Sequence, residues 1–395
     1  MMAETFKPES VEHLVEAAKW AAANGAALDI QGQGTKRGLG KPAQADAVVV
    51  DMAAISGITL YEPEELVMSA RAGTPMTEIE AALKDANQML AFEPWSPHAL
   101  YGVEGGTIGG VLACNISGPR RMQVGAARDH MLGFHGVGGE GQVFKSGGRV
   151  VKNVTGFDLT KLMAGAMGTL GMLSDVSFKV LPVPEKARTV LLFGAHDVSE
   201  ALVRAQCSEH EISACAHLPK SVAALSGVDY VKNAGTDVTC VRIEGPAPSV
   251  EVRCAALREL LAPLGAAVEE LHSSRSAALW AEIRDVSYFA GDRQLWRISV
   301  APSQGPAIAQ ALGSDYMIDW AGGLIWLALD GADDANAGQV RGAFAQGHAT
   351  LMRASDAVRT QVPVFQPQAD GLALLNERVR ENYDPANIFN PGRMT

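Results

Sequence analysis

Apolar positions along the chain predict alternating helices and strands up to about residue 184. Residues 10–23 carry apolar side chains at helical spacing, with Ser10 as a suitable N-cap. Thr74 and Pro75 are expected to open a second helix, as its cap and its first residue. Strands or hairpins are predicted at 27–31, 47–51, 57–72 and 174–181.

A different pattern begins after Pro182 and Pro184, which interrupt the last of these strands. From Arg188 the predicted order is strand, helix, strand, strand, helix, strand, and a similar order returns between Leu295 and Met352. This order resembles a duplicated ferredoxin-like sheet covered by helices on one face, so the chain is predicted to be an α+β protein. The segments of the first unit are 189–194, 198–209, 213–218, 237–243, 249–263 and 266–271.

These patterns predict two large domains and a returning C-terminal segment. The first domain is expected to have two lobes, and the last segment is expected to form a helix from Asp370. The predicted boundaries are 1–184 for the first domain, with lobes of about 1–55 and 56–184, then 185–365 for a cap domain and 366–395 for the returning segment.

Composition narrows the classes of protein that the chain can belong to. Of 395 residues, 47% are apolar and 19% are charged, which is an ordinary globular balance and excludes a disordered chain. The formal net charge of −11 opposes a large phosphate-binding surface, so nucleic acid is not an expected partner.

Five scattered cysteines without a C-x-x-C pair encode neither a disulfide framework nor a cysteine-ligated metal cluster. The sequence contains no run of 18 apolar residues, and its start lacks the basic and then apolar order of a signal peptide. We therefore expect a cytoplasmic protein with no membrane span of its own, or one held at the inner membrane through partner subunits.

Glycine is concentrated in one part of the chain. Residues 102–171 hold 18 of the 41 glycines. Such density is expected where the backbone adopts positive φ or passes close to a flat or charged ligand, although a run of tight turns is the alternative. Three candidate sites stand out: Gly32–Lys36 after a strand, the paired glycines of 105–110, and the loop 168–172.

Several ordered motifs together resemble a known family. They are I-Q-G-Q-G-T at 30–35, A-R-A-G-T-P at 70–75, G-G-T-I-G-G at 105–110, R-D-H-M-L-G at 128–133, V-V-K-N-V-T-G-F-D-L at 150–159, G-T-L-G-M-L at 168–173 and N-I-F-N-P-G-R-M at 387–394. The set is similar to FAD-binding proteins of the vanillyl-alcohol-oxidase or PCMH type. Within that superfamily it most resembles the FAD-binding E subunits of bacterial glycolate oxidases.

The resemblance implies a PCMH-type two-lobed FAD-binding domain followed by a ferredoxin-like cap. It also implies which residues lie near FAD, with Gly109 against the flavin, where an added side chain would enter the flavin channel. The implied cofactor-binding residues are Gly32, Gln33, Gly34, Thr35, Lys36, Gly105, Gly106, Thr107, Gly109, Gly110, Gly118, Arg121, Arg128, Asp129, Gly168, Thr169, Gly171, Met172, Asn390 and Arg393.

The family activity is the oxidation of glycolate to glyoxylate in a complex with a second, catalytic FAD-binding subunit and an iron–sulfur subunit. The resemblance therefore implies an FAD-dependent oxidoreductase subunit that uses a small 2-hydroxy acid, glycolate. Two alternatives stay open at this point: a stand-alone FAD-dependent dehydrogenase of a D-2-hydroxy acid such as D-lactate, and a structural or assembly subunit.

One expected motif is missing. Catalytic relatives carry an H-x-G-D-G-N-x-H segment whose histidines bind a divalent metal, and the nine histidines here form no such pair. We therefore predict no metal and assign no catalytic residue, and we expect this flavin to relay electrons. The first glycine loop also lacks the histidine that links flavin covalently in some relatives, so FAD is predicted to be non-covalent.

Aromatic and basic residues of the predicted cap allow two interpretations. Trp280, Trp296, Trp320 and Trp326 are expected in the core or at an interface. Arg284, Arg293 and Arg297 are candidates for binding a substrate carboxylate, with ordinary ion pairs as the favoured interpretation.

Overall fold

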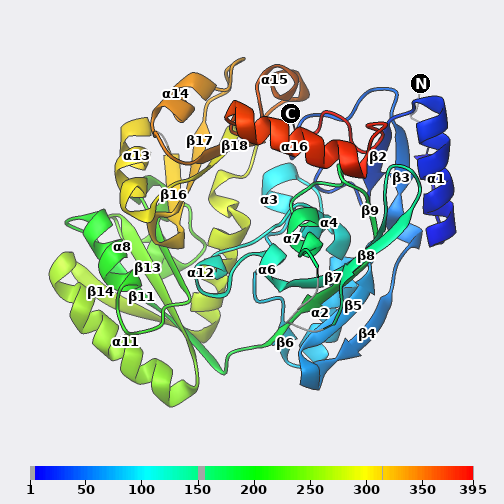
Figure 1. Cartoon of the computed structure of the whole chain (residues 1–395). Helices are drawn as coiled ribbons and strands as arrows, with labels where there is room; N and C mark the ends of the chain where they lie inside the picture. The colour runs from blue at the N-terminus through cyan, green and yellow to red at the C-terminus, as the bar shows by residue number, and fades with distance from the viewer. Residues whose placement is uncertain (1–4, 150–155, 314, 395) are drawn as a thin grey trace.

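A computed structural model describes residues 5–149, 156–313 and 315–394 (Figure 1). The motif segment 150–155 therefore lies outside the described residues. The chain begins with a parallel three-stranded sheet of order β1-β3-β2 beside helix α1. The bounds are β1 Thr5–Phe6, α1 Val11–Asn24, β2 Leu28–Gln31 and β3 Val48–Asp51. The Ser10 hydroxyl accepts a hydrogen bond from the His13 amide at 3.4 Å, which confirms the predicted N-cap.

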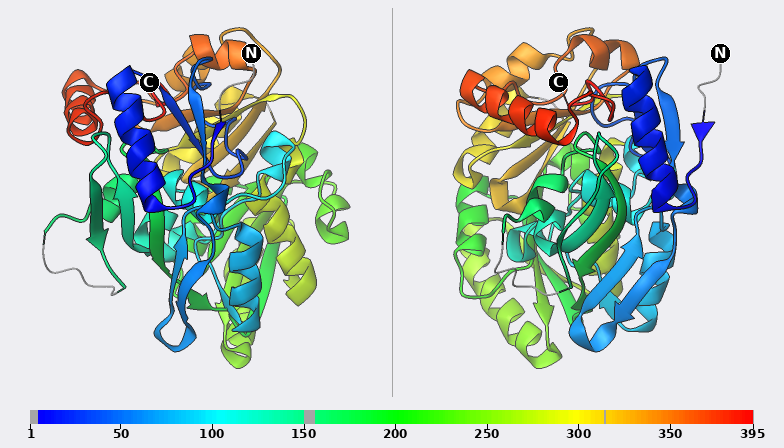
Figure 2. Two further views of the ribbon diagram at one scale, coloured as in Figure 1. Left: turned by 90° about the vertical axis from the view of Figure 1, so that its right-hand side faces the viewer. Right: turned by 45° about the vertical axis from the view of Figure 1, so that its right-hand side comes forward.

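The C-terminal end of the chain returns to this first sheet. The Leu28 amide donates to the Ile388 carbonyl at 2.7 Å, and the Asn390 amide donates to the Leu28 carbonyl at 2.9 Å. Phe389 is almost fully buried, in one cluster with Leu14 of α1. Segments more than 350 residues apart in the sequence thus form one small core. Figure 2 shows from two further sides how the C-terminal end of the chain lies beside the first sheet.

The second sheet is antiparallel and has five strands in the order β4-β5-β9-β7-β8. The predicted hairpin is confirmed as β4 and β5, while the predicted capping role of Thr74 is wrong. The Thr74 hydroxyl accepts from the Gly57 amide at 2.9 Å and donates to the Arg71 carbonyl, and α2 begins at Met76 after Pro75. The strands are β4 Ile58–Glu62, β5 Val67–Arg71, β7 Met131–Val137, β8 Val143–Gly147 and β9 Met172–Lys179, and β6 Gln88–Met89 pairs separately with β10 Leu181–Pro182.

Short helices cover this second sheet, and four of them lie within the glycine-rich segment, most of which forms loops and strands. They lie between the sheet and the rest of the molecule in Figure 1. Their bounds are α2 Met76–Asp85, α3 His98–Tyr101, α4 Ile108–Ala113, α5 Arg121–Val124, α6 Ala127–His130 and α7 Leu159–Met163. Single turns of 3-10 helix occur at Met52–Ala54, Pro63–Glu65, Ala262–Leu264, Ser287–Phe289, Pro302–Gln304 and Trp320–Gly322.

The third sheet has eight antiparallel strands and confirms the predicted duplication. Its order is β14-β11-β13-β12-β16-β17-β15-β18, so two four-stranded ferredoxin-like halves join through β12 and β16. The strands are β11 Lys186–Phe193, β12 Ala214–Leu218, β13 Val238–Gly245, β14 Ala267–His272, β15 Gln294–Ser299, β16 Asp315–Asp319, β17 Leu324–Leu329 and β18 His348–Arg353.

Helices cover both faces of this sheet, not one face as predicted. Val190 and Leu192 pack with the helices on one face, whereas Leu191 of the same strand packs on the other face in a cluster that includes Trp280 of α12. Helix α12 was not predicted and brings the sheet against the FAD-binding part of the chain. The helices are α8 Val198–Gln206, α9 Lys220–Ala223, α10 Asp229–Lys232, α11 Ala247–Leu261, α12 Ser273–Asp285, α13 Gly305–Leu312, α14 Ala337–Gly342 and α15 Asp356–Gln361.

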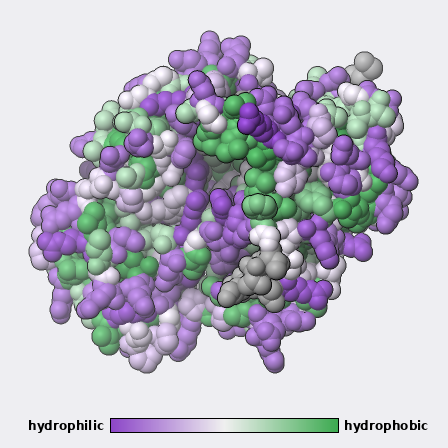
Figure 3. Space-filling view, viewed as in Figure 1, coloured by the Kyte–Doolittle hydropathy of each residue, from purple (hydrophilic) through white to green (hydrophobic). Residues whose placement is uncertain are grey.

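The predicted C-terminal helix is present as α16, Asp370–Tyr383, but its leucines are not in the core. Leu372 and Leu374 are each 50% exposed and Leu375 is 56% exposed. Hydrophobic surface is visible near α16 in the space-filling view (Figure 3). Across the described residues no helix is long and apolar enough to cross a membrane. The division into domains at residues 184 and 365 stays a prediction.

Candidate functional site

A cavity of about 860 Å³, partly open to solvent, lies where the first sheet meets the second. Concave sites lined by apolar residues and a few placed polar groups are where proteins hold small molecules and cofactors. The lining residues come from distant parts of the chain, including the end of β2, helix α4 and the C-terminal segment. Twelve of the predicted cofactor-binding residues line the cavity: Gly32, Gln33, Gly34, Thr35, Lys36, Thr107, Gly109, Gly110, Gly168, Gly171, Asn390 and Arg393.

The first glycine loop can reach α4 only because Gly32 has no side chain. A Cβ atom on Gly32 would lie 2.4 Å from the Thr107 hydroxyl oxygen. That oxygen caps α4 by accepting from the Gly110 amide at 3.2 Å. The close approach therefore places the loop after β2 against the N-terminus of α4 and closes one side of the cavity.

Two buried cations line the cavity without an acidic partner. Lys36 Nζ lies 3.3 Å from the Thr35 hydroxyl, and the Arg393 guanidinium donates to the Lys36 carbonyl at 2.9 Å. Burial lowers the pKa of both side chains. In the described part of the chain neither forms an ion pair, and the neighbouring Asp29 is already bound by Arg37 at 2.9 Å. Two uncompensated charges suit the diphosphate of FAD, which carries two negative charges.

The other eight predicted residues do not line the cavity. Gly105 and Gly106 lie behind the first loop, where the Gly106 amide donates to Gln33 Oε1 at 2.6 Å. Asp129 accepts from the Ala126 amide, and the Thr169 hydroxyl donates to the Ala166 carbonyl. Contact with FAD stays a prediction for these residues and for four more: Gly118, Arg121, Arg128 and Met172, the last of which has a fully buried side chain in the core around α1.

The expected direction of a side chain at Gly109 is wrong. A Cβ atom there would lie 2.6 Å from the Ala72 carbonyl oxygen and 2.7 Å from the Ala72 Cβ, although the Gly109 backbone lines the cavity. Valine at this position would push α4 away from the end of β5 and would not enter the flavin channel. Glycine is needed here for packing of the helix on the sheet.

Sequence reasoning missed several residues that line the same cavity. Asp29 and Arg37 flank the first glycine loop, and their positions next to that loop were a usable signal. Cys114 follows α4, and burial raises the pKa of its thiol. Four further lining residues stand within the motifs of the resemblance but were not predicted to bind the cofactor: Ile30, Gln31, Ala72 and Leu173. The rest are apolar and carry no such signal: Met52, Ala113, Met163 and Met167.

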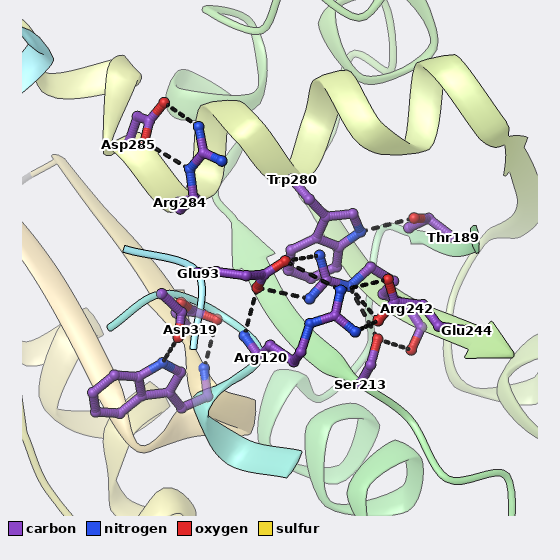
Figure 4. A network of polar contacts seen from close by, with 12 residues as sticks. Glu93, Arg120, Thr189, Ser213, Arg242, Glu244, Trp280, Arg284, Asp285 and Asp319 are labelled. Atoms are coloured by element: carbon purple, nitrogen blue, oxygen red, sulfur yellow. Dashed lines mark hydrogen bonds and ion pairs between the residues drawn. The ribbon is translucent and has the colours of Figure 1, made fainter. Parts of the chain in front are cut away.

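A buried network of charges joins the FAD-binding part to the eight-stranded sheet (Figure 4). The Arg242 guanidinium donates to both oxygens of Glu93 at 2.9 Å. Arg120, which precedes α5, donates to the Glu244 carboxylate at 2.5 and 2.8 Å. Burial opposes ionisation of Glu93, but Arg242 and Arg120 outweigh it and hold the pKa of Glu93 at about 2. Residues of both parts thus hold each other in fixed positions.

The arginines of the cap differ in their partners. Arg284 forms an ion pair with Asp285 at 2.8 Å, and Arg293 forms one with Asp315 at 2.8 Å, as the favoured interpretation predicts. Arg297 has no acidic partner among the described residues. Its guanidinium carbon lies 4.9 Å from the centre of the Trp320 ring, and that of Arg121 lies 4.5 Å from the same ring.

Asp319 lies directly before Trp320 and is 2% exposed. Burial raises the pKa of its carboxyl to about 7, and the opposing effects of the Trp320 amide, Arg242 and Arg297 only partly offset this. The carboxyl accepts a hydrogen bond from that amide at 2.7 Å. At neutral pH this buried carboxyl is therefore protonated in roughly half of the molecules.

Replacing Asp319 with asparagine should alter how stability depends on pH. An unfolded aspartate has a pKa of about 3.9, so the wild-type fold binds one more proton than the unfolded chain between about pH 4 and 7 and loses stability as pH rises through that range. Asparagine keeps the acceptor oxygen and does not titrate. The variant should gain up to roughly 3 kcal/mol relative to wild type between pH 4 and 7. Urea unfolding at each pH measures the difference, and a constant difference would contradict the raised pKa.

In the parts of the chain that the structure describes, no three histidine, cysteine or acidic side chains are grouped closely enough to hold a metal ion. The acidic residue of the cavity lining is Asp29, which Arg37 binds. The cavity thus provides cations and backbone groups for binding an anion.

Comparisons with known proteins agree with this geometry. Residues 3–147 match the family model of an FAD-binding domain, which confirms the predicted cofactor. The chain is 36% identical over 383 residues to glycolate oxidase subunit GlcE of Escherichia coli K12, covering 96% of each protein. It is 39% identical over 85 residues to glycolate oxidase subunit GlcD of Bacillus subtilis, which is 22% of this chain and 18% of that protein.

Solved structures show the same fold. p-Cresol methylhydroxylase matches with a TM-score of 0.69 at 14% sequence identity, over 99% of this chain and 88% of the other. Alkyldihydroxyacetonephosphate synthase matches with a TM-score of 0.67 at 17% identity, over 98% of this chain and 76% of the other. These matches confirm the predicted PCMH-type fold.

Proposed function

Because this chain belongs to the family of the glycolate oxidase subunit GlcE, we propose that it is the FAD-binding subunit of a glycolate oxidase that converts glycolate to glyoxylate. The observation that carries this proposal is the cavity with two buried, unpaired cations at the meeting point of the glycine loops. Lys36 and Arg393 would bind the diphosphate of FAD, and the backbone of Gly32–Gly34 would lie along it. FAD supplies two-electron redox chemistry when it is bound.

We further propose that this subunit relays electrons and does not itself take hydride from glycolate. Oxidation of glycolate removes two electrons and two protons, so a group near the flavin must take the hydroxyl proton. Among the residues lining the cavity, Asp29 is bound by Arg37, Cys114 is a neutral thiol, and Lys36 is a cation. None of these is suited to act as the base, so the hydride step is assigned to a partner flavoprotein.

The proposed partners follow from the same assignment. The relatives include subunits named GlcE and GlcD, which points to a complex of more than one chain. We propose a second, catalytic FAD-binding subunit and an iron–sulfur subunit as partners, with the complex in the cytoplasm or peripheral at the inner membrane. Capture of this chain from its native host, followed by identification of the co-purifying chains, tests this assignment.

Anaerobic rapid mixing tests the relay role. The isolated subunit, loaded with FAD, should stay oxidised for at least minutes when mixed with excess glycolate, and the assembled complex should lose its flavin absorbance. Free dithionite should reduce both samples, which controls for access to the flavin. Fast and complete reduction of the isolated subunit by glycolate or D-lactate would favour a stand-alone dehydrogenase. A purified chain that cannot be loaded with FAD would favour a structural role.

A further inference from the structure

Two arginines share one indole ring where the FAD-binding part contacts the eight-stranded sheet. Arg121 belongs to α5, Arg297 to β15, and Trp320 follows β16. Both guanidinium groups lie over the Trp320 ring, with carbon-to-centroid distances of 4.5 and 4.9 Å. The indole nitrogen of Trp320 donates to the Gly118 carbonyl at 3.1 Å, which fixes the ring between the two parts. All three side chains are half-buried.

These two arginines lack the partners that other buried arginines have. Arg242 is bound by Glu93, and Arg120 by Glu244, in the adjacent network (Figure 4). Within the described ranges, neither the Arg121 nor the Arg297 guanidinium forms a hydrogen bond or an ion pair. An ordinary structural pair of arginines at such a place would be matched by carboxylates.

The acids nearest to the pair compensate its charge only in part. Asp319 faces Arg297, but burial raises the pKa of its carboxyl to about 7, so roughly half of the carboxyl groups are protonated at neutral pH. Asp129 faces Arg121 and favours its charged form, but among the described residues it forms no ion pair with Arg121, and its carboxylate accepts from the Ala126 amide at 2.8 Å. Burial and the charge of Arg121 lower the pKa of Arg297 to about 10, so Arg297 is still a cation at neutral pH. The site holds two positive charges that repel each other.

The backbone at the ring is also strained. Trp320 has φ of 51° and Ala321 has φ of 52°, in the left-handed region that residues with side chains rarely adopt. Strain of this kind persists where the surrounding structure holds a residue in a required position, and such positions cluster at ligand sites. The strained turn presents the Trp320 ring to both arginines.

We propose that Arg121, Arg297 and Trp320 form a binding site for a small carboxylate anion of the 2-hydroxy or 2-oxo acid class. A carboxylate matches the planar fork of donors on a guanidinium and offsets one of the two positive charges, while the indole ring excludes water from one side. This inference rests on the proposed function only for the choice of glycolate as the acid. The site itself rests on the two unpaired cations, and it is separate from the cavity assigned to the diphosphate.

Binding of glycolate to the FAD-loaded subunit tests the proposal. Isothermal titration and tryptophan fluorescence at fixed ionic strength should show saturable binding of glycolate and none of its neutral amide, glycolamide. Arg297→Gln and Arg121→Gln should each weaken binding at least about tenfold, because each removes a charge-assisted contact. Arg293→Gln is the matched control. Arg293 directly precedes β15, is already paired with Asp315, and should leave glycolate binding unchanged.

Thermal unfolding separates a binding defect from misfolding. Removing one of two repelling charges should leave the melting temperature of Arg297→Gln equal to or above that of the wild type. Equal binding of glycolate and glycolamide, no saturable binding to the wild type, or full affinity in both arginine variants would each overturn the proposal. The FAD content of the same samples keeps this result separate from the proposed function, since a protein that holds FAD but binds no carboxylate contradicts only the present inference.

Discussion

Replacing Glu93 with alanine should destabilise the protein by about 3 to 5 kcal/mol, since it leaves two buried arginines with one carboxylate between them and hence an uncompensated positive charge. Glu93 accepts both hydrogen bonds from the Arg242 guanidinium and one from the Arg120 amide at 2.9 Å. Among the described residues, alanine would leave Arg242, which is 4% exposed, with Ser213 and Glu244 as its polar partners. Urea unfolding followed by fluorescence measures the loss.

The pH dependence of this effect has a definite sign. The pKa of Glu93 is held at about 2, below its unfolded value of about 4.3, so its contribution is present above pH 4.3 and is lost as pH falls towards 2. The difference between wild type and Glu93→Ala should therefore shrink in acid. Glu200→Ala is a suitable control because its pair with Arg204 is exposed, and it should cost less than about 1 kcal/mol. Similar losses in both variants would show that the network adds nothing.

Local periodicity was sufficient to predict much of this fold. The helical spacing in residues 10–23 and the Ser10 cap act within one turn, and the structure places α1 there with that cap. The repeated strand and helix order after Arg188 is also local, since each segment alternates or repeats by itself. Helix α12 was missed because the packing of its Leu279 and Trp280 against the sheet appears only when the chain is folded.

The candidate site was predictable where glycine itself was the signal. Gly32 and Gly34 line the cavity, and glycine is selected at Gly32 by close approach to Thr107 and at Gly34 by a φ of 67°. The direction of a long side chain depends instead on distant partners. Arg121 lies over the ring of Trp320. Trp320 in turn donates a hydrogen bond to the carbonyl of Gly118, which precedes it by 202 residues in the sequence. Met172 lies at the start of β9 on the face towards α1, so strand alternation places its side chain in the core.

Lys36 provides the sharpest test of the cofactor site, since two effects of opposite sign are expected from one substitution. Methionine keeps the length of the side chain and removes a buried charge that has no acidic partner among the described residues. The FAD-free protein should therefore become more stable, by about 1 to 3 kcal/mol, because a buried ion is replaced by an apolar group. The same change removes a charge-assisted contact to the diphosphate, worth about 1.5 to 3 kcal/mol, so FAD should bind roughly 10- to 100-fold more weakly.

A misfolded variant would lose both stability and FAD affinity. The expected result is specific to this site, because the melting temperature of the FAD-free protein rises while the dissociation constant for FAD also rises. Fluorescence titration of the FAD-free protein measures the affinity, and thermal unfolding without FAD measures the stability. Lys84→Met is the matched control, because Lys84 is exposed on α2 and both quantities should be unchanged within about 0.5 kcal/mol. Unchanged FAD affinity in Lys36→Met would show that the diphosphate lies elsewhere, since a buried cation beside two phosphates cannot be removed without cost.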